Sequence, residues 1–141
     1  MALASLLAHS RGEVLRQFQT QIVVPMPMHW VRRVRRGING PELIAEVLAG
    51  KLGLPLATKC LKRTQLTRLQ TQLSPTERQM NQRNSFRVRR AWCVAGKRIL
   101  LVDDVLTTGA TASAAAKVLR KAGAQAIFVA ALARGIGDDA V

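Results

Sequence analysis

The segment Ile99-Leu-Leu-Val-Asp-Asp-Val-Leu-Thr-Thr-Gly-Ala-Thr111 decides the expected fold of this chain. Its apolar beginning, which continues from Lys97, predicts a strand that is buried on both faces and ends near Val102. Asp103 and Asp104 then lie at the carboxyl end of that strand, where open α/β sheets place their ligands. The segment therefore predicts both a parallel sheet and the position of a binding site.

A second feature of this segment is the turn from Thr107 to Thr111, which leads into a helix. Gly109 lets the backbone approach a ligand closely, and hydroxyl groups, free amides and the helix dipole surround that point. Such a turn is a cradle for a terminal phosphate. The residues expected to line the site are Asp103, Asp104, Val105, Thr107, Thr108, Gly109, Ala110 and Thr111.

The two carboxylates suit the other end of a sugar phosphate, because they would repel the phosphate itself. They can accept hydrogen bonds from neighbouring ribose hydroxyls, and they can help to position Mg²⁺ through water. Adjacent side chains on an extended backbone point in different directions. We therefore expect one of Asp103 and Asp104 to face the ribose and the other to make an indirect or metal-linked contact.

The rest of the chain alternates between apolar runs and helical patterns. The expected elements are one or two helices from residue 2 to about 19, a strand at 22–24, a helix at 41–52, a strand at 54–61, a helix at 111–122 and a buried strand at 126–132. This alternation predicts a single-domain α/β fold with a central, mostly parallel sheet flanked by helices.

Two of these helices carry apolar stripes that are expected to face the core, and a glycine follows each of them. The first stripe consists of Leu43, Ile44, Val47, Leu48 and Leu52. The second consists of Ala112, Ala115, Ala116 and Leu119.

Residues 62–85 are polar and rich in Arg, Gln and Thr, which predicts a long, flexible basic loop. Loops of this length in a compact domain are usually functional lids or disordered segments. Within it, Ser74-Pro-Thr-Glu77 is a capping box that predicts a short helix, and residues 86–92 are expected to form a strand or hairpin arm. The domain is expected to span residues 1–134, followed by a loose tail at 135–141.

The charge of the chain is strongly positive, because 22 Lys and Arg residues face eight Asp and Glu residues for a net charge of +14. Residues 30–98 alone hold 16 basic and three acidic residues, a net charge of +13. A solvated basic face would explain one such run. The deficit of acids covers two separate segments, however, and favours a polyanionic partner. Pyrophosphate and nucleic acid both fit, and charge alone does not choose between them.

Cysteine usage and the amino terminus indicate the environment of the protein. Cys60 and Cys93 stand 33 residues apart without a CxxC pair or paired histidines, which predicts two buried free thiols and no zinc site in this chain. Residues 1–7 are apolar but too short to span a bilayer, and they lack the basic start of a signal peptide. We therefore expect a cytoplasmic protein without a membrane span.

An apolar strand, two acids, two apolar residues and then Thr-Thr-Gly-Ala-Thr resemble the motif with which type I phosphoribosyltransferases bind phosphoribosyl pyrophosphate (PRPP). A receiver domain would instead scatter its acids over separate strands, and a P-loop would need a Gly-Lys-Ser/Thr sequence that this segment lacks. The resemblance implies that the ligand is PRPP, or a similar ribose 5-phosphate compound, bound together with Mg²⁺.

Further stretches resemble the ComF (competence protein F) family, in order and at matching spacing from about residue 22 to 134. They are Val23-Val-Pro-Met-Pro-Met-His29, Arg35-Arg-Gly-Ile-Asn39, and the spaced residues Arg63, Thr67, Gln70, Leu73, Arg78, Asn81 and Phe86. The chain departs from the family pattern in two places. Gly40 stands where the family has glutamine, so any contact from that side chain is lost, and the family's amino-terminal four-cysteine zinc ribbon is not in this chain.

This resemblance implies a pyrophosphate loop after Val24 and a flexible loop at 63–83 that closes over the site and brings cations to the leaving group. The residues implied for these loops are Pro25, Pro27, His29, Arg35, Arg36, Arg63, Arg68 and Arg78. For His29, a surface or packed histidine without a ligand is the alternative, and for each single arginine the alternative is a solvated side chain.

Two functions remain open at this point. The chain is either a phosphoribosyltransferase for an unidentified acceptor or a PRPP-binding module without turnover that handles single-stranded DNA through its basic face. The family resemblance implies a role in DNA uptake, with competence proteins as partners. Thr107 stands where purine-specific relatives often carry an acid as general base, and no aromatic-rich segment for stacking a base follows Leu132. Aromatic residues are few, so DNA contacts are expected to be electrostatic.

Overall fold

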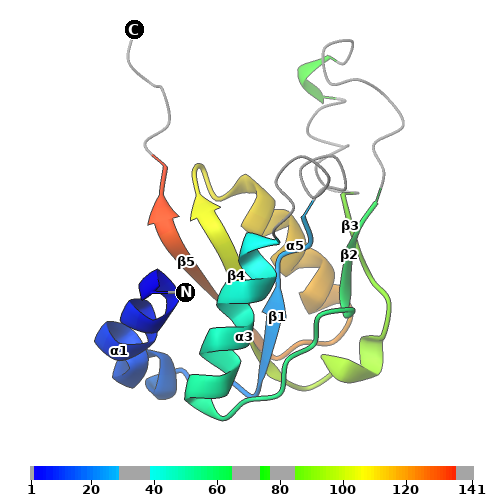
Figure 1. The fold of residues 1–141 in the computed structure, drawn as a ribbon. Coiled ribbons are helices and arrows are strands. Elements are labelled where there is room, and N and C mark those ends of the chain that lie inside the picture. Colours follow the sequence, from blue (N-terminus) through cyan, green and yellow to red (C-terminus); the bar gives the residue numbers. More distant parts are fainter. Residues whose placement is uncertain (1, 29–38, 65–73, 77–84, 136–141) are drawn as a thin grey trace, which may run out of the picture.

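The computed structural model describes residues 2–28, 39–64, 74–76 and 85–135. In chain order, the described elements are α1 (Ala2–Gln17), β1 (Ile22–Pro25), α3 (Gly40–Leu52), β2 (Leu61–Arg63), β3 (Phe86–Val88), the 3-10 helix η2 (Ala91–Cys93), β4 (Arg98–Leu106), α5 (Ala110–Lys121) and β5 (Ala126–Arg134). This succession of helices and strands confirms the expected α/β fold (Figure 1).

Strands β1, β4 and β5 form one parallel sheet with β4 in the centre (Figure 1). Val24 of β1 pairs with Leu101 of β4, and Val102 of β4 pairs with Ala130 of β5. Because the three strands run in the same direction, their carboxyl ends meet at one edge of the sheet. The prediction of a mostly parallel sheet is therefore confirmed.

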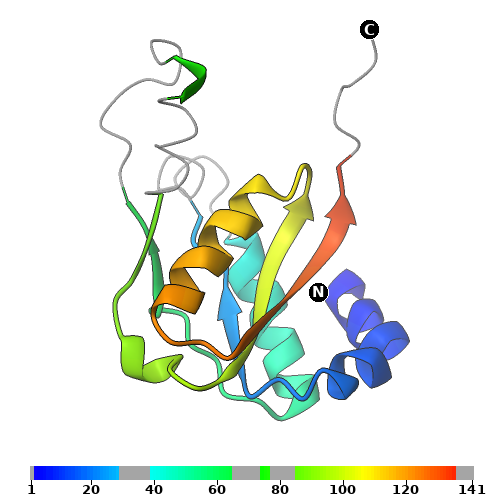
Figure 2. The same ribbon diagram turned by 180° about the vertical axis from the view of Figure 1, so that it is seen from behind.

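Successive residues of β4 belong to two different hydrophobic clusters, because side chains alternate between the two faces of a strand. Ile99 and Leu101 pack on the side of α5 and the β2–β3 hairpin, whereas Leu100 and Val102 pack on the side of α1 and α3. All four side chains are buried. Figure 2 shows α5 in front of the sheet, with α3 behind it. Strand β4 is thus buried on both faces, as its sequence predicts.

Helix α3 begins and ends where its sequence predicts. Pro41 lies in the first turn, where a missing amide costs nothing. Gly53 follows the helix with φ 67°, and its N–H donates to the carbonyl of Ala49, a left-handed cap that glycine adopts easily. The buried face differs from the predicted stripe, since Ala45 and Ala49 are buried and Leu43 is 37% exposed at the beginning of the helix.

Two predictions for the carboxyl-terminal half need correction. Helix α5 buries Ala114 in place of Ala116, so its inner face is turned slightly from the predicted stripe. Strand β5 is less buried than predicted: Val129 is 42% exposed, and Ala130 is its one buried residue. The reason is that β5 lies at the edge of the described sheet, where β4 is its one neighbour among the described strands.

Strand β4 is also longer than predicted, because it continues past Val102 to Leu106. Its pairing with β5 continues beyond the apolar run, with Asp103 opposite Ala131 and Leu106 opposite Arg134. Polar side chains do not interrupt this ladder, since the pairing uses backbone groups. The two acids therefore lie inside a strand rather than after it.

The strand predicted at 54–61 is wrong over most of its length. Only Leu56 bridges to Val23, through hydrogen bonds of 2.9 Å from Val23 N to Pro55 O and from Ala57 N to Val23 O. Pro55 has no amide for further pairing. The segment therefore adds one bridge to the sheet, beside β1, and not a full strand.

A two-stranded antiparallel hairpin of β2 and β3 frames the expected long loop. Most of the loop lies outside the described residues. In the predicted capping box, Pro75 and Thr76 are helical, and Glu77 lies outside the described part of the chain. The strand predicted at 86–92 ends at Val88, and the 3-10 helix η2 replaces the remainder.

Both cysteines are free thiols, as predicted. Cys60 is buried, but Cys93 is only half-buried in η2. Burial and, secondly, the nearby Cys93 thiol raise the pKa of Cys60 to about 11. Cys60 is therefore a protonated thiol of the core at neutral pH.

The hydrogen bonding between β4 and β5 extends one residue beyond the predicted domain boundary at residue 134, because Gly135 N donates to Leu106 O at 2.9 Å. Residues 136–141, the rest of the predicted tail, lie outside the described part of the chain.

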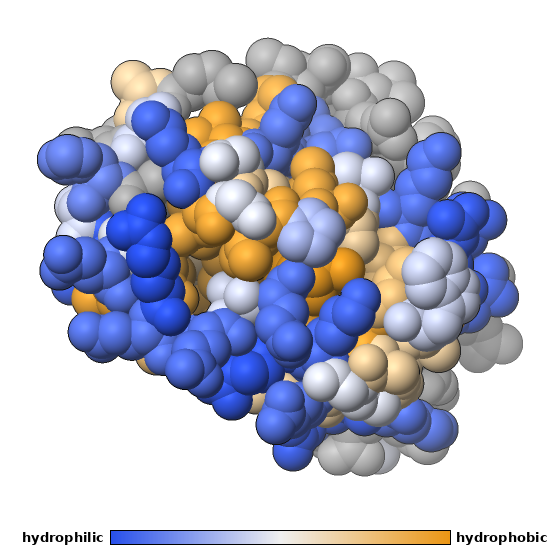
Figure 3. All heavy atoms as spheres, turned by 90° about the horizontal axis from the view of Figure 1, so that it is seen from below, coloured by the Kyte–Doolittle hydropathy of each residue, from blue (hydrophilic) through white to orange (hydrophobic). Residues whose placement is uncertain are grey.

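None of the described helices is long and apolar enough to cross a membrane. At the end of the molecule opposite the carboxyl edge of the sheet, hydrophilic residues surround a central group of apolar ones (Figure 3).

Candidate functional site

The predicted acids are consecutive in β4 but lie on different faces of the sheet. Asp103 follows Leu101 on the side of α5 and the hairpin, and Asp104 follows Val102 on the side of α1 and α3. Asp103 has 8% of its surface exposed, whereas Asp104 is half-buried. They point in different directions, as their positions on an extended backbone imply. Which of them meets a ribose stays a prediction.

Each carboxylate accepts a hydrogen bond from the amide of the next residue. Asp103 Oδ1 accepts from Asp104 N at 2.9 Å, and Asp104 Oδ1 accepts from Val105 N at 2.8 Å. These bonds orient both side chains. The other oxygen, Asp104 Oδ2, lies beside Gly40 at the beginning of α3, where an added Cβ would be 3.4 Å away.

The protonation of Asp103 is sensitive to these surroundings. Burial raises the pKa of Asp103 from 3.8 to about 6. The Asp104 amide opposes that rise, the Asp104 carboxylate adds to it through a side-chain hydrogen bond and through its charge, and the charge of Arg63 lowers the pKa. A buried carboxyl beside a second carboxyl and an arginine is typical of functional sites, although structural ion networks share the arrangement.

The turn predicted to hold a phosphate joins β4 to α5. Thr107 and Thr108 are exposed, and Gly109 has φ 80°, a left-handed conformation that favours glycine. Thr108 Oγ1 accepts from Ala110 N at 3.3 Å, and Gly109 O accepts from Ser113 N at 2.8 Å. The turn is therefore compact, with its hydroxyl groups at the surface.

The first amides of α5 remain available to a ligand. Thr111 N and Ala112 N have no hydrogen-bond partner within the described ranges, as is usual in the first turn of a helix. Apart from its chain neighbours, no described residue lies within 4 Å of the position that a Cβ at Gly109 would take. Free amides at the positive end of a helix attract anions. The geometry fits a terminal phosphate, and contacts of Val105, Ala110 and Thr111 with one stay predictions.

Gly135, which follows β5, packs closely against the beginning of this turn. A Cβ at Gly135 would lie 2.8 Å from Thr107 Cγ2 and 3.6 Å from Val105 Cγ1. From the sequence alone, Gly135 is expected in a loose tail and its contact with Thr107 is missed, because a glycine near the end of a chain is equally typical of a tail. The side chain of any other residue would displace Thr107.

Arg63 is a predicted loop residue that the structure brings toward the acids. It ends β2, and its positive charge is near enough to Asp103 to lower the pKa of that carboxyl. Its guanidinium lies over the Phe86 ring, 5.5 Å from the ring centroid, a cation–π contact that helps to orient it.

The other predicted loop residues divide into two groups. Pro25 ends β1 and is buried, and Pro27 is half-buried beyond it. Met26, between them, donates its amide to Val102 O at 2.7 Å and so ties this segment to β4. The remaining residues lie outside the described part of the chain, and their contacts stay predictions: His29, Arg35, Arg36, Arg68 and Arg78.

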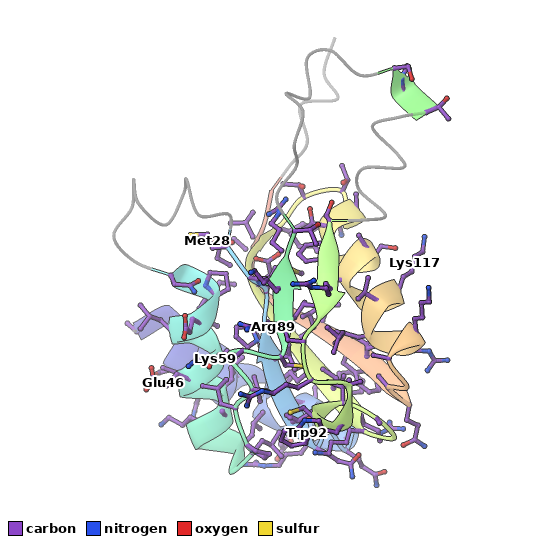
Figure 4. All side chains as sticks on the ribbon, turned by 90° about the vertical axis from the view of Figure 1, so that its right-hand side faces the viewer. Met28, Glu46, Lys59, Arg89, Trp92 and Lys117 are labelled. Carbon is purple, nitrogen blue, oxygen red and sulfur yellow. The ribbon has the colours of Figure 1, made fainter. Side chains whose placement is uncertain are left out.

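A groove between α3 and the β2–β3 hairpin gathers basic side chains, and we call it the basic groove. Its volume is about 730 Å³, and residues 25–28 and the beginning of α3 form one wall. Figure 4 shows Met28, Lys59 and Arg89 on this side of the molecule. The cations that line the basic groove are Lys59, Lys62, Arg63, Arg87 and Arg89.

Two of these cations face each other across the hairpin. Lys62 lies directly opposite Arg87, and both side chains are exposed. Like charges in this position destabilise a strand pair, and neither cation has an ion-pair partner in the described segments. The acid that lines the groove, Glu42, accepts a hydrogen bond of 2.6 Å from Asn39 Nδ2. A bound anion would relieve the repulsion between Lys62 and Arg87.

The carboxylates of Asp103 and Asp104 are suitable ligands for a Mg²⁺ ion that binds together with a phosphorylated compound. Within the described residues, no three His, Cys, Asp or Glu side chains gather as a metal site. Asp103 and Asp104 supply carboxylate oxygens, the donors that Mg²⁺ prefers. This ion commonly combines one or two carboxylates with the phosphates of a substrate.

Comparison with known families agrees with this geometry. The model of the family described as "Phosphoribosyl transferase domain" matches residues 39–140, which include α3, β4 and α5. The chain belongs to the phosphoribosyl transferase family. The predicted resemblance to the ComF family is confirmed, since competence protein F of Haemophilus influenzae is 35% identical to this chain over 119 residues.

These relatives are longer proteins than this chain. The match to competence protein F covers 81% of this chain and 50% of the relative. The DNA utilization protein YhgH of Escherichia coli K12 is 35% identical over 112 residues, which cover 79% of this chain and 48% of that protein. The chain thus spans about half the length of the curated relatives it matches.

Solved structures of a phosphoribosyltransferase and of a phosphoribosylpyrophosphate synthetase share the fold. The purine phosphoribosyltransferase of Pyrococcus horikoshii matches 100% of this chain and 78% of its own, with a TM-score of 0.62 and 20% identity. The phosphoribosylpyrophosphate synthetase of Mycobacterium smegmatis matches 93% of this chain and 33% of its own, with a TM-score of 0.56 and 28% identity. The predicted type I phosphoribosyltransferase-like fold is confirmed.

Proposed function

We propose that this chain binds PRPP with Mg²⁺ at the carboxyl edge of its sheet and transfers phosphoribose to an acceptor, in a cytoplasmic protein that serves DNA uptake. One observation carries the proposal: two carboxylates, a glycine turn and the free amides of a helix follow one another along β4 and α5. PRPP carries hydroxyls between two phosphorylated ends, and this order of groups complements it. The names of the relatives, competence protein F and DNA utilization protein, support the cellular role.

Each group has its own task in this proposal. The amides at the beginning of α5 and the hydroxyls of Thr107 and Thr108 hold the 5-phosphate. Asp104, the more exposed acid, accepts hydrogen bonds from the ribose hydroxyls, and Asp103 supports it from the other face of the sheet. Bound Mg²⁺ supplies charge neutralisation at the pyrophosphate.

Arg63 has a role at the leaving group. When the bond from ribose C1 to pyrophosphate breaks, C1 becomes positively charged and the leaving oxygens gain negative charge. A guanidinium that is held against Phe86 near Asp103 can stabilise those oxygens without reorganisation. The arginines of the predicted loops would add to this stabilisation.

Isothermal titration calorimetry with PRPP, ribose 5-phosphate and pyrophosphate, each with Mg²⁺, tests this proposal. We expect PRPP to bind most tightly, because the site holds both ends of the ligand, and each fragment to bind more weakly. Pyrophosphate release across a panel of bases and amines then tests turnover. Equal affinities for PRPP and pyrophosphate would mean that the sugar phosphate is not recognised, and the proposal would be wrong.

The basic groove favours a second candidate function, a PRPP-binding module without turnover that binds single-stranded DNA. Five cations line the groove, and Lys62 repels Arg87 until an anion binds. A phosphodiester strand supplies a row of such anions. With few aromatic residues for stacking, its affinity would come from the backbone phosphates and would fall steeply with salt.

Fluorescence anisotropy with a labelled oligothymidylate at rising salt separates the two candidates. Salt-sensitive binding, together with no pyrophosphate release for any acceptor, would support the module. Pyrophosphate release with one acceptor would support the transferase. Absence of oligothymidylate binding even at low salt would exclude the module.

A further inference from the structure

Trp92 is an exposed aromatic side chain at the end of the molecule away from the carboxyl edge of the sheet (Figure 4). It lies in η2 and is 73% exposed, whereas the other exposed large apolar side chains of the described residues are between 37% and 44% exposed. Tryptophan is mostly buried in folded proteins. Within the described part of the chain, the Trp92 ring forms no stacking or cation–π contact. The face of this ring is therefore available to a ligand.

The turn that carries Trp92 is held in place by the core and by the backbone. Val94, two residues further on, is 0% exposed. After the turn, Gly96 N donates to Gly123 O at 2.8 Å. A ligand that packs on Trp92 does not have to order a loose loop, so its binding avoids that cost in conformational entropy.

Cations without partners lie on the same side of the molecule as Trp92. Arg89 and Arg90 come directly before η2, and Figure 4 shows Lys59 and Arg89 on the side that carries Trp92. All three cationic side chains are exposed, and none has an ion-pair partner in the described segments. Residues 51–64 and 85–102 contain no Asp or Glu. The positive charge of this surface is therefore available to phosphate groups.

These cations connect Trp92 to the basic groove. Lys59 and Arg89 line the groove, and the three residues from Arg89 to Trp92 span at most about 10 Å. Cations in a groove beside an exposed aromatic ring are typical of proteins that bind single-stranded nucleic acids. Tryptophan and arginine are also frequent in protein interfaces. Here, however, the cations continue into the groove, as a chain of phosphates requires.

We propose that Trp92 is a stacking platform for one unpaired base of a DNA single strand whose phosphates follow Arg90 and Arg89 into the basic groove. The inference rests on the second candidate function, DNA binding, and adds the selection of single strands to it. Duplex DNA keeps its bases paired and stacked inside the helix, so it offers no base to Trp92. The phosphates supply most of the affinity and its dependence on salt, and the stacked base adds a contribution that salt changes little.

Tryptophan fluorescence of the full chain tests the stacking. The chain has two tryptophans, Trp30 and Trp92, so Trp30→Phe leaves Trp92 as the one source of tryptophan emission. Oligothymidylate should quench this emission when a base stacks on the ring. An abasic strand of the same length keeps the phosphates and lacks the bases. It should bind about tenfold more weakly and leave the emission unchanged. Equal quenching by the abasic strand would overturn the proposal.

Three substitutions measure the contribution of the ring to affinity, by anisotropy with labelled oligothymidylate. Trp92→Ala should lower the affinity by about tenfold at every salt concentration. Trp92→Phe should keep most of the affinity, because a smaller aromatic ring still stacks. Val14→Ala is the control, since it shortens a side chain that is 40% exposed on α1, outside the basic groove. It should leave the affinity as it is in the unchanged chain.

Arg90→Gln should weaken binding through the phosphates instead. It should reduce the slope of log affinity against log salt by about one, as the loss of one phosphate contact predicts. Trp92→Ala should leave that slope unchanged. An equal reduction of the slope in Trp92→Ala would mean that the ring only positions the cations, and the stacking proposal would be wrong.

The same titrations separate a failure of this inference from a failure of DNA binding. If oligothymidylate binds without quenching Trp92, or binds Trp92→Ala as tightly as the unchanged chain, the stacking site is wrong and the DNA-binding candidate stands. A protein partner would then be the occupant that remains for this surface. If oligothymidylate does not bind even at low salt, the DNA-binding candidate fails, and the inference fails with it.

Discussion

Gly135 at the end of β5 leaves room for Thr107 at the beginning of the turn after β4. The Gly135 amide donates to Leu106 O at 2.9 Å, and a Cβ at Gly135 would come within 2.8 Å of Thr107 Cγ2. The contact joins the ends of two neighbouring strands. It therefore sets the position of the turn that we propose for the 5-phosphate.

Gly135→Ala should move Thr107 and weaken phosphate binding. Thr107 is exposed and can shift, so we expect little loss of stability but a fall in PRPP affinity of about three- to tenfold by calorimetry. Thr107→Ser removes Cγ2 and keeps the hydroxyl. The double variant Gly135→Ala/Thr107→Ser should regain most of the affinity, and an unchanged affinity in Gly135→Ala alone would contradict this role for the contact.

Gly109→Ala should strain the turn without any steric clash. Gly109 has φ 80°, and none of the residues that the structure describes lies within 4 Å of the position that an added methyl group would take, so the backbone conformation alone should cost about 1 kcal/mol. Gly53→Ala is the matched control, because Gly53 has φ 67°, is equally open and ends α3. Urea unfolding should show similar losses in both variants. Only Gly109→Ala should weaken PRPP binding, and an equal effect of Gly53→Ala on PRPP would count against the proposed site.

The raised pKa of Asp103 predicts a stability that falls as the pH rises. Its pKa moves from 3.8 to about 6 in the folded protein, so between these values the folded chain binds a proton that the unfolded chain has lost. The corresponding stability, about 3 kcal/mol in full, is present below about pH 4 and is lost as the pH rises through about 6.

Asp103→Asn should abolish this dependence, because the amide is neutral throughout. Urea unfolding of both chains at about pH 4 and about pH 7.5 measures it. We expect the stability of the variant relative to the unchanged chain to increase with pH. A constant difference between the two chains would mean that Asp103 titrates normally.

Lys62→Glu should stabilise the hairpin and weaken binding to DNA. The substitution places opposite charges across β2 and β3 where Lys62 now faces Arg87, which is worth about 0.5–1 kcal/mol in thermal unfolding. Lys62→Glu/Arg87→Glu restores a like-charged pair and should lose the gain. For oligothymidylate binding, Lys117→Glu on α5 is the charge-matched control (Figure 4). Equal loss of affinity in Lys62→Glu and Lys117→Glu would mean that net charge, and not the basic groove, binds the strand.

The strand, turn and helix around Gly109 could be predicted from the sequence because their determinants are local. A continuous apolar run predicts the buried part of β4, and Pro41 and Gly53 mark the two ends of α3 through the dihedral angles that they favour. The fold class follows from the order of such elements. The family resemblance rests on the same residues and is confirmed by the family match.

Other features depend on contacts between residues that are distant in the sequence. The extension of β4 to Leu106 requires β5 as a partner, and the exposure of β5 follows from its place at the edge of the sheet. The hairpin consists of strands too short to show alternation. The approach of Gly40 to Asp104 and of Gly135 to Thr107 is visible only in the folded chain.

Calorimetry with PRPP and Mg²⁺ on the unchanged chain and on Asp103→Asn/Asp104→Asn tests whether the two carboxylates of β4 bind PRPP. The substitutions keep the size of both side chains and remove their charges, so a folded variant isolates the carboxylates. We expect saturable binding to the unchanged chain and none to the double variant. PRPP affinity that is the same in both chains would contradict the assignment of the site to β4 and its turn.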